Sequence, residues 1–184
     1  MHDPDRFAGN PSPERPFPFA RRWHVIDEID LVGLVADHAG TERLCMRLEA
    51  CADRLPERPA PAEIDDLCAA LQSRVLDHID REDRLLAAMF AHEVRDPLCR
   101  ALLDHIHARH VACTVLAQDL IASLNATAPG HRTICAEALG YMLRCFFDGC
   151  RAAMAFEELA ILALAGTRLT REARALLTHR LAAA

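Results

Sequence analysis

Proline and glycine divide this chain into a few long uninterrupted stretches, and these breaks constrain the fold more than any other feature. Five of the ten prolines fall within residues 4–18 and three within residues 56–61, while Pro97 and the Pro129-Gly130 pair stand farther along. Proline and glycine end or interrupt helices. The stretches between them predict helices over four long segments and one shorter segment: Ile26–Leu55, Pro61–Ala91, Asp96–Asn125, Arg132–Ala165 and Thr170–Leu181.

The proline-rich start predicts two unequal parts of the chain. Residues 1–24 are expected to be an irregular N-terminal arm, because so many prolines exclude a regular helix there. Residues 25–184 are expected to form one helical domain, since 184 residues suit a single domain of ordinary size. Thr170 is the expected N-cap of the last helix, and Gly166 is expected to end the helix before it.

Each long segment carries apolar residues at alternating steps of three and four, which indicates one buried face on each helix. Alanine, leucine, arginine and glutamate dominate these segments and β-branched residues are sparse, a composition that favours helix over strand. Short loops require neighbouring helices to run antiparallel. The predicted fold is therefore all-α, an up-down-up-down antiparallel four-helix bundle with a short C-terminal fifth helix and an irregular N-terminal arm.

Ionisable side chains interrupt these apolar faces. A carboxylate is almost never buried unless it is paired or bound to a metal, because losing its water costs several kcal/mol. His78 and Glu82 are four positions apart on one segment, so their side chains share a face and can reach one ion. Imidazole and carboxylate together suit iron, manganese or zinc. The set predicted to hold a metal is His38, His78, Glu82, His110 and Glu157.

Ordinary explanations for the same residues stay open at this point. A single histidine on an apolar face is commonly a hydrogen-bonded core residue. Glu82 could pair with Arg81 or Arg84, and Glu157 with Arg151, which would make each carboxylate part of a salt bridge of little energetic value. These arginines, however, fall off the apolar faces.

The pattern resembles the hemerythrin-like (HHE cation-binding) family of four-helix bundles. The resemblance covers residues 27–164 and rests on four motifs: Asp37-His38, His78-Ile-Asp-Arg-Glu82-Asp-Arg-Leu-Leu, Asp104 to His110, and Glu157-Glu158-Leu-Ala-Ile-Leu. It implies a non-haem di-iron centre held by histidines and two bridging carboxylates, used for dioxygen binding or for sensing oxygen, iron or nitric oxide. It also implies that the five residues above are the ligands.

Two ligand positions of that family differ in this chain. Ala153 stands where the family usually has a histidine four residues before the last acidic ligand, and Ile106 stands where some members have the first histidine of a pair. His107, three residues before His110, is an additional candidate ligand. Three outcomes stay open: two metals with labile positions, one metal held by His78, Glu82 and either His38 or His110, or a relic of a metal site. The changed ligand set argues against a reversible oxygen carrier.

Composition excludes several other functions. The chain has 21 basic residues, all arginine, against 27 acidic ones, and a net charge of −6 disfavours nucleic-acid binding. The absence of lysine excludes Schiff-base chemistry, and no glycine-rich nucleotide motif occurs. No apolar run is long enough to span a membrane and no secretory start is present, so we expect a cytoplasmic protein whose eight cysteines are mostly buried reduced thiols.

The sequence therefore predicts a metal-binding protein with iron, di-iron or mononuclear, as the expected cofactor and zinc as the alternative metal. Its expected role is sensing or redox handling of a small molecule such as dioxygen, peroxide or nitric oxide. The alternative is a helical interaction or dimerisation module with a vestigial or zinc-occupied site. A homodimer or a protein partner is compatible with either, and neither involves a membrane.

Overall fold

The computed structural model describes residues 28–126 and 134–183, and this part of the chain is helical with no strand. The predicted all-α class is therefore confirmed for the described residues. The expected N-terminal arm and the Pro129-Gly130 turn lie outside these ranges. The elements are α1 (Glu28–Arg54), α2 (Pro61–Leu71), the π-helical segment η1 (Gln72–Leu76), α3 (Asp77–Met89), α4 (Pro97–Asn125), α5 (Ala136–Ala165), the 3-10 turn η2 (Gly166–Arg168) and α6 (Arg171–Ala183).

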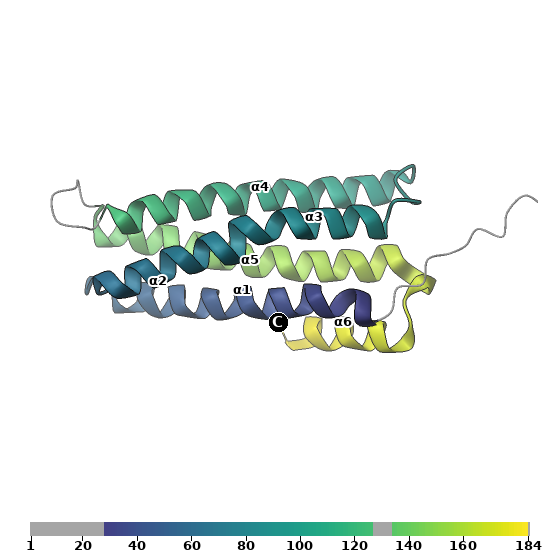
Figure 1. Ribbon diagram of the computed structural model, residues 1–184, viewed down its shortest axis with the longest axis horizontal. Helices are drawn as coiled ribbons and strands as arrows, with labels where there is room; N and C mark the ends of the chain where they lie inside the picture. The colour runs from purple at the N-terminus through teal and green to yellow at the C-terminus, as the bar shows by residue number, and fades with distance from the viewer. Residues whose placement is uncertain (1–27, 127–133, 184) are drawn as a thin grey trace, which may run out of the picture.

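The long helices lie side by side along one axis, as Figure 1 shows. The helix α5 packs against both α1 and α4, and α2 and α3 together form the remaining rod, which contacts α1 and α4. The shorter α6 follows a turn after α5 and lies beside α5 and α1. This arrangement gives each long helix two neighbours and one face toward a common interior.

Side chains at the helix ends explain several of the boundaries. The Asp96 carboxylate accepts hydrogen bonds from the backbone N–H groups of Leu98 (2.7 Å) and Cys99 (3.3 Å), which satisfies donors that α4 itself leaves free. Thr170 Oγ1 accepts from the N–H of Ala173 at 3.2 Å, so Thr170 caps α6 as predicted. The helix α5 ends as predicted at Gly166, whose positive φ of 49° is a conformation that favours glycine.

The second predicted helix, Pro61–Ala91, differs from the structure because η1 interrupts it. The apolar residues Leu67, Leu71 and Val75 follow one another in steps of four, and each such step rotates a side chain by about 40° around a regular α-helix. The wider turn of a π-helix takes up this drift. All three side chains are consequently buried, and so are His78 and Glu82 in the helix that follows.

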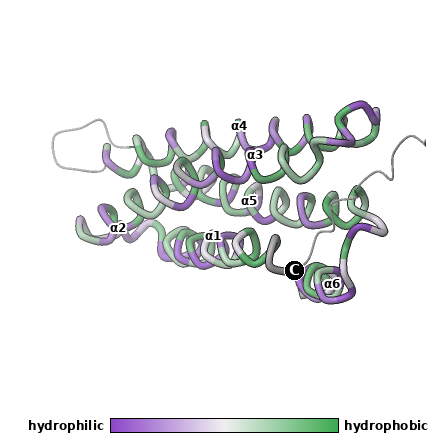
Figure 2. Tube along the Cα trace, turned by 45° about the vertical axis from the view of Figure 1, so that its right-hand side comes forward, coloured by the Kyte–Doolittle hydropathy of each residue, from purple (hydrophilic) through white to green (hydrophobic). Residues whose placement is uncertain are grey.

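The apolar interior is divided into two clusters along the bundle. The first includes Leu44, Leu48, Ala117, Leu120 and Phe146, and the second includes Leu31, Leu86, Ile106, Ile161 and Leu177. Polar and apolar residues alternate along each helix in Figure 2, as expected for helices with one buried face. Between the two clusters the buried residues of α1, α3, α4 and α5 are ionisable, so a polar layer crosses the middle of the bundle.

No helix within the described ranges combines the length and the apolar character that crossing a membrane requires.

Candidate metal centre

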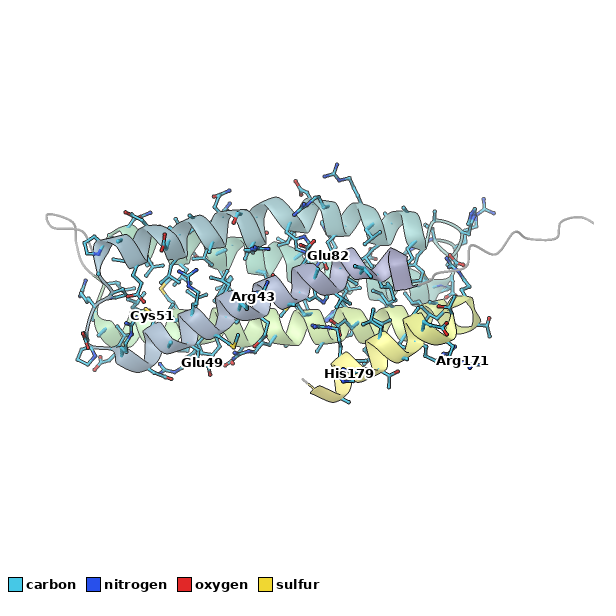
Figure 3. All side chains as sticks on the ribbon, turned by 60° about the horizontal axis from the view of Figure 1, so that its bottom comes forward. Arg43, Glu49, Cys51, Glu82, Arg171 and His179 are labelled. Carbon is cyan, nitrogen blue, oxygen red and sulfur yellow. The ribbon has the colours of Figure 1, made fainter. Side chains whose placement is uncertain are left out.

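All five residues of the predicted ligand set lie in this polar layer. They come from α1, α3, α4 and α5, and each is at most 7 % exposed. Figure 3 shows Glu82 near the middle of the bundle's length, with Cys51 nearer to one end. The structure therefore brings together, inside the bundle, five side chains that are up to 119 positions apart in the sequence: His38, His78, Glu82, His110 and Glu157.

Glu82 is the hub of the cluster because its two oxygens face different histidines. Its Oε1 lies 2.8 Å from Nε2 of His38, whereas its Oε2 lies 3.3 Å from Nε2 of His78 and 3.6 Å from Nε2 of His110. A carboxylate arranged in this way can serve two ions at once or hold one ion through a single oxygen.

Glu157 faces the same interior from α5. Its Oε2 lies 3.5 Å from Nε2 of His38 and 3.6 Å from Nε2 of His110. One ligand atom each from His38, Glu82 and Glu157 lies within 4.8 Å of the others. Ligand atoms about 2.0–2.2 Å from one ion are separated by roughly 3–4 Å, so these separations suit direct coordination.

The outer nitrogen of each histidine faces a second carboxylate. Nδ1 of His38 lies 2.7 Å from Glu158 Oε1, Nδ1 of His110 lies 2.7 Å from Asp83 Oδ1, and Nδ1 of His78 lies 3.1 Å from Asp37 Oδ2. The first two pairs meet hydrogen-bond geometry, whereas the His78 pair is close in distance but misaligned. Each imidazole thus turns Nε2 inward and Nδ1 toward an orienting carboxylate, the arrangement that metal-bound histidines adopt.

Sequence reasoning identified none of these three carboxylates individually, although a signal was present. Asp37, Asp83 and Glu158 each stand directly beside a predicted ligand in the sequence. Neighbouring residues on a helix point about 100° apart, so the residue next to an inward-facing ligand faces the adjacent helix. That position lets each carboxylate reach a histidine of another helix.

The additional candidate His107 lies outside the inner cluster. Its side chain is 66 % exposed, and its Nδ1 lies 2.9 Å from Oδ2 of Asp83. His107 and His110 therefore share one carboxylate, with His110 on the buried side.

The surrounding carboxylates favour the protonated form of His38 and His110. Burial opposes the charged form of His38, but hydrogen bonds with Glu157, Glu158 and Glu82 outweigh it and hold the pKa of His38 well above its usual value. For His110, burial is likewise outweighed, here mainly by Glu157, and the pKa rises to about 9. Burial would raise the pKa of Glu82, yet His38 and His78 hold that pKa far below its usual value.

Three buried polar atoms of the cluster have no hydrogen-bond partner: both ring nitrogens of His78 and Oε1 of Glu157. Leaving such atoms unsatisfied costs about 1–3 kcal/mol each. A metal ion bound between the carboxylates would satisfy a nitrogen of His78 and the free oxygen of Glu157. The residues present therefore fit a cation.

The salt-bridge explanation for the carboxylates does not match the structure. Arg151 binds Glu42 at 3.0 Å and Glu49 at 2.8 Å, both on α1, rather than Glu157. Arg84 donates to the backbone carbonyl of Asp80 at 2.8 Å.

The cluster is reached through two adjoining cavities. The inner cavity of about 40 Å³ is lined by the predicted ligands together with Ala153, Cys113 and Cys150. The outer cavity of about 270 Å³ is lined by Asp37, Ser73, Arg74, His78 and Arg81. Because Arg74 and His78 line both, the outer cavity leads toward the inner one.

Ala153 and Ile106, which stand at two expected ligand positions, have different surroundings. Ala153 lines the inner cavity, so the absence of a longer side chain there leaves room beside Glu157. Ile106 is 3 % exposed and belongs to the second apolar cluster, away from the inner cavity's lining.

Comparison with protein families gives one result. Residues 31–165 match the family model described as the hemerythrin HHE cation-binding domain. Neither the comparison with curated proteins nor the comparison with solved structures gives a match.

Proposed function

Since the chain belongs to the hemerythrin HHE cation-binding domain family, we propose that its buried cluster binds iron and that the loaded protein senses or carries out redox chemistry on a small molecule. The small molecule is dioxygen, peroxide or nitric oxide. The proposed ligands are His38, His78, Glu82, His110 and Glu157. The same proposal includes an up-down-up-down order of α1, the α2–η1–α3 segment, α4 and α5. The short connections between these segments support it.

The observation that carries this proposal is the common orientation of the three imidazoles. Each directs Nε2 toward Glu82 and Nδ1 toward Glu158, Asp37 or Asp83. A histidine buried only for packing needs one hydrogen bond, and three such histidines have no reason to converge on the same carboxylate. Inward nitrogens around shared carboxylates, with His38 and His110 each hydrogen-bonded from outside by another carboxylate, are typical of metal centres.

His107 is left out of the proposed set because its side chain is 66 % exposed and faces Asp83. It serves as a control instead.

The residues around the cluster support small-molecule chemistry in preference to a larger substrate. Iron, when bound, would supply an exchangeable coordination position and one-electron chemistry. The chain itself supplies an inner cavity of about 40 Å³, which accommodates only a few heavy atoms, and Ala153 keeps this space open beside Glu157. The predicted ligands that line this space are at most 7 % exposed, which limits their contact with bulk water.

Metal analysis of protein purified without chelators or an affinity tag tests the proposal. We expect iron in the wild type and its loss in the Glu82→Ala, Glu157→Ala double variant. The matched control is Glu42→Ala, Glu49→Ala, which removes two carboxylates from the surface of α1 that bind only Arg151. About two ions per chain support a bridged pair, and about one supports the single set of His38, Glu82 and Glu157.

Wild-type protein with no metal would contradict the proposal and favour the interaction module. Zinc in place of iron would retain the site but remove the redox role, because zinc has no redox chemistry. Retention of metal in the double variant would show that the ion is bound elsewhere.

A further inference from the structure

The first apolar cluster contains a group of cysteines that lies next to the predicted metal ligands. Cys45 of α1, Cys113 of α4 and Cys150 of α5 are all buried, and Cys113 and Cys150 also line the inner cavity. All eight cysteines of the chain are free thiols in the structure. The proposed metal site uses none of them, although two lie beside the space that a small molecule would occupy.

Within this group the sulfurs of Cys113 and Cys150 are 3.8 Å apart, with the Cys150 thiol donating to Cys113. A disulfide has an S–S distance near 2.05 Å, so the sulfurs must approach by roughly 1.8 Å. The two cysteines face each other across the packed interface between α4 and α5. Oxidation to a disulfide would therefore bring the two sulfurs together across this interface.

The two sulfurs differ in character. The hydrogen bond from Cys150 outweighs burial and lowers the pKa of the Cys113 thiol to about 7. Hydrogen bonds with Cys113 and Cys45, and then burial, raise the pKa of the Cys150 thiol well above its usual value. Because Cys150 donates the hydrogen bond between the two sulfurs and Cys113 accepts it, Cys113 is suited to attack an electrophile and Cys150 to keep its proton until later.

We propose that Cys113 and Cys150 are a peroxide-reducing dithiol, with Cys113 as the attacking sulfur and Cys150 as the resolving one. The ligand is hydrogen peroxide or another peroxide small enough for the inner cavity. This activity goes beyond the proposed metal centre because the electrons come from the thiols. It requires no metal.

The reaction balances with one dithiol and one peroxide. The Cys113 sulfur attacks one peroxide oxygen, the O–O bond breaks, and the leaving hydroxide takes up the proton that Cys113 released to form water. Cys113 is then a sulfenic acid. The Cys150 sulfur attacks the Cys113 sulfur, the S–O bond breaks, and hydroxide leaves with the Cys150 proton as a second water. The dithiol loses two electrons, and the peroxide gains them.

The test uses the full chain, reduced, stripped of metal with a chelator and exposed to equimolar hydrogen peroxide. Samples are alkylated at intervals, and peptide mass spectrometry follows each thiol. We expect Cys113 and Cys150 to be lost together as a linked pair, on the order of tenfold faster than Cys99. Cys99 is the control because it is also buried, at 1 % exposed against 8 % for Cys113 and 4 % for Cys150, but lies in the second apolar cluster.

Variants separate the two roles. Cys150→Ser should stop at the sulfenic acid of Cys113, which dimedone traps, and Cys113→Ser should lose the fast reaction. Cys99→Ser should keep it. A bulkier oxidant, tert-butyl hydroperoxide, should react more slowly with the pair, because a cavity of about 40 Å³ holds only a few atoms. The wild-type peptide analysis stands by itself even if a buried serine unfolds a variant.

Survival of Cys113 and Cys150 for as long as Cys99 would overturn the proposal and leave these thiols a packing role. Oxidation of either without linkage to the other would also overturn it, and so would equal rates with the two peroxides. Since the protein in this test carries no metal, each of these results is independent of whether the metal proposal holds.

Discussion

Asp83 of α3 holds His110 of α4: the carboxylate Oδ1 lies 2.7 Å from Nδ1 of the imidazole. The same ring presents Nε2 to Glu82 and Glu157 at 3.6 Å. The orientation of His110 toward the cluster therefore depends on a residue that does not enter it.

Replacing Asp83 with alanine should weaken metal binding without unfolding the bundle. Carboxylates that orient metal-bound histidines typically contribute about 10–100-fold to metal affinity. We expect a decrease of that size in a competition titration against a chromophoric chelator, with an unchanged helical circular dichroism spectrum. Asp80→Ala is the matched control, since Asp80 is an exposed residue of the same helix. Asp83→Asn keeps a hydrogen-bond acceptor and should recover part of the affinity. Equal affinities for the Asp83 and Asp80 variants would contradict this role.

Replacing His38 with alanine should destabilise the metal-free protein. His38 is 2 % exposed and contacts Glu82, Glu157 and Glu158, so its removal leaves buried carboxylates without their shared partner. Breaking a buried pair in this way costs about 3–5 kcal/mol. Urea unfolding at pH 7 in the presence of a chelator measures the loss.

The exposed His107 supplies the control for that measurement, because His107→Ala removes only a surface contact with Asp83 and should change stability by less than about 1 kcal/mol. The loss of unfolding free energy caused by His38→Ala should be smaller near pH 5, because the carboxylates left without a partner can take up protons there. A cost that does not depend on pH would argue against unpaired carboxylates as its source.

The sequence predicted the helices, the buried faces and the members of the inner cluster because each leaves a local signal. Ionisable residues on an apolar face, such as His38 and Glu157, are visible in a single helical period. The outer carboxylates leave only a weaker signal, their position directly beside a ligand, because such a residue resembles an ordinary surface residue until the adjacent helix is placed. Glu158 illustrates this, because its partners come from α1 and α6.

The interruption of the second helix at Gln72–Leu76 also escaped prediction. The residues there have ordinary helix propensity, and the wider turn is selected by how Val75 and His78 pack against other helices. Val75 and His78 are buried, and farther along Leu86 is buried whereas its neighbour Leu85 is only partly buried. Tertiary packing decides such a choice between neighbours.

The metal-free protein should lose stability as pH rises from about 6.5 to 9. The pKa of His110 is raised to about 9 in the folded protein, above the value near 6.5 expected for the unfolded chain. A raised pKa contributes stability that is fully present below pH 6.5 and is lost as pH rises through 9, here roughly 3 kcal/mol. Urea unfolding at several pH values with a chelator measures this slope.

Bound metal should reverse that trend. Metal binding displaces protons from the histidines, so metal affinity rises over the same pH range. Unfolding in excess Zn²⁺ should therefore show no loss of stability from pH 6.5 to 9. A His110→Asn variant should reduce the slope of the metal-free protein to the part that the raised pKa of His38 contributes, and an unchanged slope in that variant would contradict the assignment to His110.

Arg180 should couple α6 to the centre. Its Nε donates to Glu158 Oε1 at 2.7 Å, the oxygen that also accepts from Nδ1 of His38. Burial would raise the pKa of Glu158, but His38 and Arg180 hold it below its usual value, so both partners favour the charged carboxylate. Arg180→Ala removes one of the two and should cost about 1 kcal/mol of unfolding free energy, together with a several-fold loss of metal affinity.

The control for Arg180 lies on the same helix, where Arg171 is exposed at the first turn, as Figure 3 shows. Arg171→Ala should leave metal affinity unchanged, and Arg180→Lys should recover part of it, because lysine keeps the charge but not the geometry of the guanidinium. If Arg180→Ala lowers stability but leaves affinity at the wild-type value, α6 only covers the second apolar cluster through Ala173 and Leu177. If affinity falls as well, the last helix takes part in orienting His38.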